Sequence, residues 1–239
     1  MLYIFTKIKP KTERLETPFE EKIKKKLADS GENVPWDEYP RPQMRRESYL
    51  CLNGKWDFKI LKGDKTRFDG EILVPFPVES RLSGVELDVG KKDKLVYTRK
   101  FDLPAGFKKD KLLLHFGAVD QICDVFINGK HIGNNRGGYI PFCFDVTDCC
   151  VNSGNVITVE VRDALDLELP YGKQRKKRGG MWYTPVSGIW QTVWMESVTN
   201  DSIEDIKITP SLTEVLIEIK GGSPLKTVVF DGREIPVLD

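Results

Sequence analysis

The chain has 239 residues, of which 40% are hydrophobic and 31% are charged, a composition ordinary for a soluble globular protein. Lys and Arg total 37 against 36 Asp and Glu, and the resulting formal net charge of +1 is too small to attract nucleic acid, an anionic membrane or an acidic polymer. We therefore expect neither a nucleic-acid partner nor a membrane partner. The length allows one large domain or two modest ones.

The cysteines and the N-terminus bear on the cellular compartment. There are five cysteines, an odd number, and two of them are adjacent without any CxxC pair: Cys51, Cys123, Cys143, Cys149 and Cys150. This pattern disfavours a zinc site or a disulfide framework and favours reduced thiols. The N-terminal apolar run is short for a signal peptide, and no run approaches the roughly 20 apolar residues of a membrane helix. We predict a soluble cytoplasmic protein without a metal or cofactor.

The first 38 residues predict an N-terminal helix followed by an extended arm. Residues 11–30 have helical signals: Thr17 as a cap, Pro18 at the first helical position, and glutamates that precede lysines. Residues 34–42 contain three prolines, which disfavour helix in themselves and in the residues before them.

From about Ser48 the pattern changes to short strands separated by turn residues. Asn53-Gly54 predicts a tight turn, and Asn128-Gly129 predicts the clearest hairpin of the chain. Apolar and polar residues alternate in several of the candidate strands: 56–60, 95–101, 112–116, 123–127 and 157–161. Many short strands of this kind predict an all-β antiparallel sandwich.

The composition changes again after about Asn200. Three short strands are expected at residues 203–209, 215–220 and 227–230, separated by Pro-Ser and Gly-Gly-Ser-Pro segments. Only 39 residues follow Asn200, slightly below the roughly 40 that an independent domain without disulfides or metals usually needs. Residues 201–239 therefore read as the beginning of a second sandwich.

The most distinctive segment is residues 179–196, which contains Trp182, Tyr183, Trp190 and Trp194. Aromatic residues beside glycines suit either a sandwich core or a surface that stacks against sugars. For Trp182, Tyr183 and Trp190 we favour closure of the core. Strand geometry predicts Trp190 and Trp194 on one face, with Ile189, Val193 and Met195 on the other, so both faces are expected to be buried.

Several segments follow one another over residues 39–200 as a recognisable series: residues 39–43, 52–58, 74–80 (VPFPVES), 96–101, 125–130, 137–139, 144–147, 155–161 and the aromatic segment. In this order they resemble the sugar-binding domain of glycoside hydrolase family 2, the family of β-galactosidases and β-glucuronidases. Each match is weak alone, and together they are specific. The resemblance implies a jelly-roll, galactose-binding-like β-sandwich over residues 39–200 and the start of an immunoglobulin-like sandwich over residues 201–239.

The resemblance also implies what the chain lacks. In this family a catalytic TIM barrel follows these two domains, and two barrel glutamates carry out retaining hydrolysis. A barrel needs about 250 residues, and none is present. We expect the chain to be inactive alone and to have no catalytic residue of its own. Its expected partners are a β-glycoside and the barrel of the parent polypeptide, and a homo-oligomer is left open.

The candidate substrate-binding residues are Lys173, Gln174, Arg175, Trp182 and Tyr183. The first three lie in a basic segment that resembles a "GKQ" loop of a bacterial branch of the family, and Arg suits a planar carboxylate. The alternative is a solvated basic loop. In some galactosidases an acidic residue precedes the Met-Trp pair and binds sugar through a cation. Gly180 stands there in this chain, which argues against that contact.

Two histidines, His115 and His131, are present, and a structural role is expected for His115 because it falls on a strand. Two other functions compete with the support domain of a glycosidase. One is a stand-alone carbohydrate-binding module, and the other is a structural interaction module that would self-associate through exposed apolar area.

Overall fold

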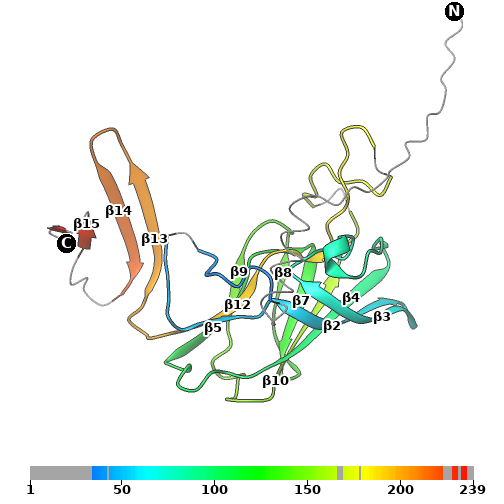
Figure 1. Cartoon of the computed structure of the whole chain (residues 1–239), viewed down its shortest axis with the longest axis horizontal. Helices are drawn as coiled ribbons and strands as arrows, with labels where there is room; N and C mark the ends of the chain where they lie inside the picture. Colours follow the sequence, from blue (N-terminus) through cyan, green and yellow to red (C-terminus); the bar gives the residue numbers. More distant parts are fainter. Residues whose placement is uncertain are drawn as a thin grey trace, which may run out of the picture.

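The computed structural model describes residues 34–41, 43–165, 169–177, 179–222, 228–230 and 233–235. The helix expected at residues 11–30 lies outside them. The described residues form an all-β structure in which two antiparallel sheets pack face to face, as predicted (Figure 1).

The larger sheet has six strands in the order β3-β2-β4-β10-β7-β8. Its strands in chain order are β2 (Gly54–Lys62), β3 (Lys65–Val74), β4 (Asp93–Phe101), β7 (Ile122–Ile127), β8 (Lys130–Arg136) and β10 (Asn155–Arg162). The smaller sheet has the order β1-β12-β5-β9, with β1 (Tyr49–Cys51), β5 (Lys111–Phe116), β9 (Phe142–Asp145) and β12 (Val193–Val198). A 3-10 turn, η1 (Arg81–Ser83), lies between β3 and β4.

Alternation along β2 explains why this strand lies on the core. Trp56, Phe58 and Ile60 are buried, whereas Lys55 and Lys59 are exposed on the other face. The two lysines pair across the strands with Glu71 and Asp69 of β3, at 3.0 and 2.9 Å. One face is therefore held by apolar burial and the other by exposed ion pairs, which contribute little.

Strand β12 of the smaller sheet is covered on both sides. Leu112, Leu114 and Phe116 of β5 point into the sandwich core, and every residue of β12 is buried. The outer face of β12 is covered by residues 34–41 and 43–46 of the arm, because Tyr39, Arg41 and Arg46 all reach Glu196. The expected burial on both faces of this strand is confirmed.

The tight turn predicted at Asn53-Gly54 is wrong. The chain crosses there from β1 in one sheet to β2 in the other, so the two strands do not pair. Asn53 is buried and its side chain replaces backbone partners: the amide donates to the carbonyl oxygen of Pro35, and its oxygen accepts from the amide of Val193. The hairpin predicted at Asn128-Gly129 is confirmed by the pairing of β7 with β8.

Trp190 and Trp194 do not share a strand face as predicted. A break at residues 190–192 separates β11 (Gly188–Ile189) from β12, and β11 pairs instead with β6 (Val119–Asp120). Trp194 stacks on His115 with a centroid distance of 4.8 Å on the outer face of the smaller sheet. Ile189, Val193 and Met195 do lie in the core.

The strands predicted in the tail are present as β13 (Ile203–Pro210), β14 (Val215–Gly221) and β15 (Val228–Phe230), and β16 (Arg233–Ile235) pairs with β15. The hairpin β13–β14 extends away from the sandwich (Figure 1). Its register places Ile206, Ile208 and Pro210 opposite Ile219, Ile217 and Val215. One face of the hairpin is thus wholly apolar, and Ile208 and Val215 are more than half exposed.

All five cysteines are free thiols. The residues that the structure describes contain no helix with the length and apolar character needed to cross a membrane.

Candidate functional site

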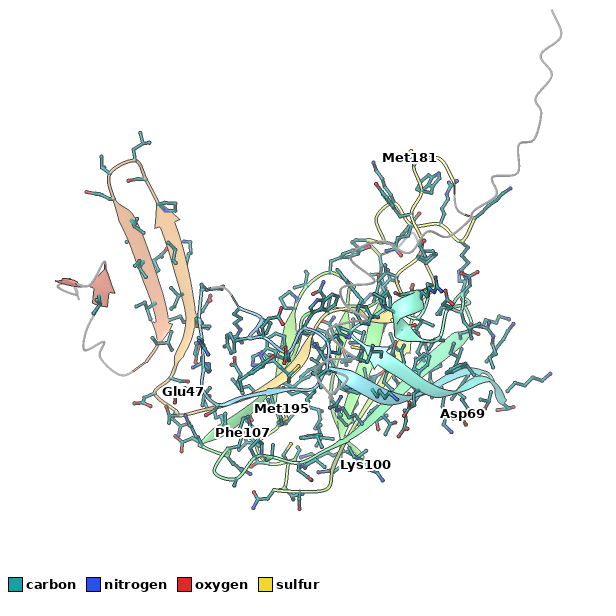
Figure 2. All side chains as sticks on the ribbon, in the orientation of Figure 1. Glu47, Asp69, Lys100, Phe107, Met181 and Met195 are labelled. Atoms are coloured by element: carbon teal, nitrogen blue, oxygen red, sulfur yellow. The ribbon has the colours of Figure 1, made fainter. Side chains whose placement is uncertain are left out.

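The candidate site is the long loop between β10 and β11, whose described parts are residues 163–165, 169–177 and 179–187. It projects from one end of the sandwich, and Met181 lies at its outer end (Figure 2). The two arms of the loop are joined by backbone hydrogen bonds from Tyr183 to Lys173 and from Arg175 to Tyr183, at 2.8 and 3.1 Å. The loop therefore has its own internal order.

The structure brings the five predicted residues together in this loop, but exposes them unequally. Lys173 and Arg175 are exposed, Trp182 is half-buried, and Tyr183 is 70% exposed. The guanidinium of Arg175 lies 3.9 Å from the centroid of the Trp182 ring, which is cation–π geometry. An aromatic face, a phenol and a cation are thus presented side by side.

Gln174 differs from its four neighbours because its amide is used inside the protein. It is buried, its nitrogen donates to the hydroxyl of Tyr139 at 2.8 Å, and its oxygen accepts from the amide of Val186 at 2.7 Å. Both ends of the side chain hold the loop in place. A sugar hydroxyl would have to displace one of these bonds.

The favoured alternative, in which the aromatic residues of this segment close the core, is wrong for three of them. Trp182 and Tyr183 lie in the projecting loop, and Trp190 is half-buried at its base. The indole nitrogen of Trp190 donates to the carbonyl oxygen of Gly138 at 2.8 Å, and its ring meets Tyr139 edge-on. The glycine pair and Pro185 carry the chain away from the sheet, a break that alternation alone did not reveal.

The base of the loop is held by a buried group of acids that sequence reasoning missed. Ser187 donates its backbone N–H to Glu79 Oε2 at 3.0 Å, and its hydroxyl oxygen lies 2.7 Å from both Glu79 Oε1 and Asp163 Oδ2. All three residues are at least 93% buried. Burial raises the pKa of Glu79 to about 7, and the negative charge of Asp163 adds to the rise.

Asp120 is the third acid at this base. Its pKa is raised to about 7, chiefly by burial and also by the charges of Asp163 and Glu79, while a hydrogen bond with Gln174 partly opposes the rise. Its backbone pairs with Gly188 in the β6–β11 ladder. Gly138 approaches the Asp120 carboxylate so closely that a Cβ atom at residue 138 would collide with it. The acids therefore lie in a tightly packed place.

A second polar site lies on the outer face of the smaller sheet, beside a cavity of about 500 Å³. Its centre is Glu196, which contacts Tyr39, Arg46 and His115. Burial by itself raises the pKa of Glu196, but hydrogen bonds from His115 and Tyr39 outweigh burial and hold this pKa at about 2. Burial is the largest influence on the pKa of His115 and lowers it, although Glu196 opposes this shift, and the imidazole ring stacks on Trp194. A structural role for His115 stays our prediction.

The sequence contains both segments that form this group of acids, but nothing in it shows that the two segments lie together. Glu79 is the last residue but one of the VPFPVES segment, and Ser187 belongs to the aromatic segment 108 residues later. Each was recognised as part of a pattern, yet no periodicity links them. Among the described residues, no group of three or more His, Cys, Asp or Glu side chains is arranged to hold a metal ion.

Comparison with known proteins identifies the sandwich. Residues 80–192 match the model of the glycosyl hydrolase 2 galactose-binding domain-like family. A β-galactosidase of Thermoanaerobacter pseudethanolicus is 28% identical over 148 residues, which are 56% of this chain and 19% of that protein. A β-glucuronidase of Bacteroides fragilis is 35% identical over 119 residues, or 47% of this chain and 16% of that protein. The chain thus corresponds to less than a quarter of either relative.

A solved structure of a β-glucuronidase from an uncultured Clostridium species superposes with a TM-score of 0.58 at 24% identity, covering 80% of this chain and 37% of that one. At this identity the likeness establishes the fold, and the fold agrees with the family match. Residues 80–192 therefore belong to the galactose-binding-like domain of glycoside hydrolase family 2.

Proposed function

We propose that this chain is the sugar-binding and support domain of a retaining family 2 β-glycosidase whose catalytic barrel lies outside these 239 residues. The observation that carries the proposal is the projecting loop, in which Arg175, Trp182 and Tyr183 are presented together on an ordered base. A loop on a rigid sandwich can position side chains at the mouth of a neighbouring domain. The relatives named as β-glucuronidases and β-galactosidases support a β-glycoside as the substrate.

Within this proposal the five residues divide into two roles. Tyr183 offers an exposed ring face for a sugar, and Trp182 offers the ring face opposite the one that Arg175 covers. Lys173 and Arg175 offer donors to hydroxyl or carboxylate oxygens. Gln174 positions the loop through Tyr139 and Val186 and does not contact the sugar. Because the cations outnumber the acids in this loop, an acidic sugar is a better ligand than its neutral counterpart.

The first test is hydrolysis and binding by the 239-residue chain itself. We expect no turnover of nitrophenyl β-D-glucuronide or β-D-galactoside, and only weak calorimetric heats with the corresponding methyl glycosides. Turnover that persists through repeated purification would overturn the support-domain proposal. Saturable binding tighter than millimolar would favour the second candidate, a carbohydrate-binding module, for which the exposed ring of Tyr183 is the specific observation.

The second test uses the longer polypeptide that the proposal requires. Trp182→Ala and Tyr183→Ala should each raise KM for a β-glycoside about three- to tenfold, since a stacking contact is worth roughly 0.5–1.5 kcal/mol. Met181→Ala, an exposed neighbour at the end of the loop, is the matched control and should leave KM unchanged. Equal effects of all three substitutions would contradict a specific contact.

A further inference from the structure

The hydrogen-bond geometry at Ser187 requires a proton that ionised carboxylates do not provide. Its hydroxyl oxygen lies 2.7 Å from Glu79 Oε1 and 2.7 Å from Asp163 Oδ2. A serine hydroxyl carries one hydrogen and can donate to only one of these oxygens. The other short contact is a hydrogen bond only if the carboxyl group there carries a hydrogen and donates it to the serine oxygen. Two ionised carboxylates would leave one contact repulsive in a buried place.

The surroundings of Glu79 and Asp163 also favour a protonated carboxyl group. Asp120 is 1% exposed, and its Oδ1 has no hydrogen-bond partner. Among the described residues, the other titratable groups recorded as interacting with these three carboxyls are the phenols of Tyr97 and Tyr139, and burial is the main cause that raises both of their pKa values. The phenols are uncharged near neutral pH, so the electrostatic interactions recorded among these groups are repulsions between acids.

We propose that Glu79, Asp120 and Asp163 form a proton-holding cluster that positions the long loop, with one proton shared between Glu79 and Asp163 through Ser187. In the protonated state Glu79 Oε1 donates to the serine oxygen, and the serine hydroxyl donates to Asp163 Oδ2. Release of this proton to water leaves one carboxylate facing the serine oxygen without a hydrogen. That repulsion weakens the hydrogen bonds of Ser187 and so loosens residues 179–187, the part of the loop that carries Trp182 and Tyr183.

The pKa values place this change near neutrality and fix its sign. The pKa of Glu79 and that of Asp120 are both raised to about 7, chiefly by burial. An acid that binds its proton more tightly in the folded chain stabilises the fold below its unfolded pKa, and this stability is lost as pH rises through the folded pKa. Order in the loop is therefore greatest at acidic pH and decreases between pH 6 and pH 8.

The test is hydrogen–deuterium exchange of the segment 179–188 in the 239-residue chain, corrected for the intrinsic effect of pH. The fraction of an acid that keeps its proton falls about tenfold for each pH unit above its pKa. Because the pKa of Glu79 is about 7, we expect protection of the Ser187 amide to fall about fivefold between pH 7 and pH 8 and about tenfold for the next pH unit. A protonated carboxyl should also be visible as an infrared carbonyl band that is present at pH 6 and absent at pH 9.

Two variants separate the proposal from a purely structural role. Glu79→Gln keeps a donor toward the serine oxygen and an acceptor for the Ser187 N–H, so the pH dependence of protection at Ser187 should be much weaker than in the wild type. The infrared band should lose the part that belongs to Glu79, and the part that belongs to Asp120 should remain. Glu71→Gln, at an exposed position on β3, is the matched control and should retain the wild-type dependence of protection on pH. If Glu79→Gln does not fold, Asp163→Asn makes the same substitution on the other side of the serine.

Three results would overturn the proposal. The first is constant protection of the wild-type chain from pH 6 to pH 8. The second is a wild-type pH profile in both Glu79→Gln and Asp163→Asn, and the third is a loss of protection in these variants that is the same at every pH. None of these measurements involves a sugar. The cluster can therefore fail while the proposed function stands, and the reverse is equally true.

Discussion

The hydroxyl group of Tyr97 occupies the space that a Cβ atom would need at Gly188. Tyr97 belongs to β4 in the larger sheet, and Gly188 starts β11 at the end of the long loop with a φ of +83°. The glycine is therefore required twice, for its backbone conformation and for the close approach of the phenol. This contact fixes where the loop returns to the sandwich.

Gly188→Ala should be strongly destabilising. Backbone strain at positive φ costs about 1–3 kcal/mol, and overpacking adds about 1–3 kcal/mol. Gly84→Ala is the matched control, because Gly84 has a φ of +81° but open space at the Cβ position, so only the strain should appear. Urea denaturation of both variants checks this. Equal losses of stability would show that Tyr97 does not restrict the site, whereas partial rescue by Tyr97→Phe would support the contact.

Glu196→Gln should destabilise the chain by about 3–5 kcal/mol at pH 7, because it removes the charged partner of buried groups. The wild-type pKa of about 2 lies below its ordinary value, so the stabilisation by Glu196 is full above about pH 4.5 and is lost as pH falls toward 2. The variant should lack this part of the acid dependence. Denaturation midpoints at several pH values measure it, with Glu71→Gln as an exposed control expected to change stability by about 0–1 kcal/mol.

Asn53→Ala should cost about 1–3 kcal/mol, because buried backbone groups at Pro35 and Val193 would lose their partner. The loss should also free the arm, which would appear as faster proteolysis after Arg45 or Arg46. Asn134→Ala, an exposed position on β8, is the control and should change stability by less than about 0.5 kcal/mol. Unchanged proteolysis in Asn53→Ala would show that other contacts suffice to hold the arm.

The apolar face of the β13–β14 hairpin should make the chain self-associate as its concentration rises. Ile208→Lys combined with Ile217→Lys should abolish association, because it places charge on that face. Thr209→Lys lies on the opposite face and should leave association unchanged. Sedimentation velocity at several concentrations measures this association. A wild-type chain that stays monomeric at high concentration would refute the expectation. An immunoglobulin-like sheet packed on this face stays our prediction for residues 201–239.

The strands were predictable because their signals are local. Trp56, Phe58 and Ile60 alternate with charged residues, and the pairing of charges across β2 and β3 follows from that alternation. The hairpin at Asn128-Gly129 was equally local, since its two strands are adjacent in the chain. The same two-residue signal at Asn53-Gly54 was misleading because a buried asparagine there replaces the partners of the crossing chain.

The site was only partly predictable because its contacts join residues that lie far apart in the sequence. The loop residues could be selected by their chemistry, but the position of Gln174 depends on Tyr139, 35 residues earlier. The contact between Glu79 and Ser187 spans 108 residues, and nothing in either segment indicates the other. Exposure of Trp182 and Tyr183 likewise depends on where the loop leaves the sheet, which apolar periodicity does not encode.

The distant anchorage of the loop limits how this domain can diversify. A transfer of residues 169–188 between relatives would carry Ser187 and Gly188 into a protein whose own Glu79, Tyr97 and Asp163 must already suit them. At the outer part of the loop, the guanidinium of Arg175 packs on Trp182 of the same loop. New specificities can therefore arise by exchange at the tip, while the base changes only through coordinated substitutions in three separate parts of the gene.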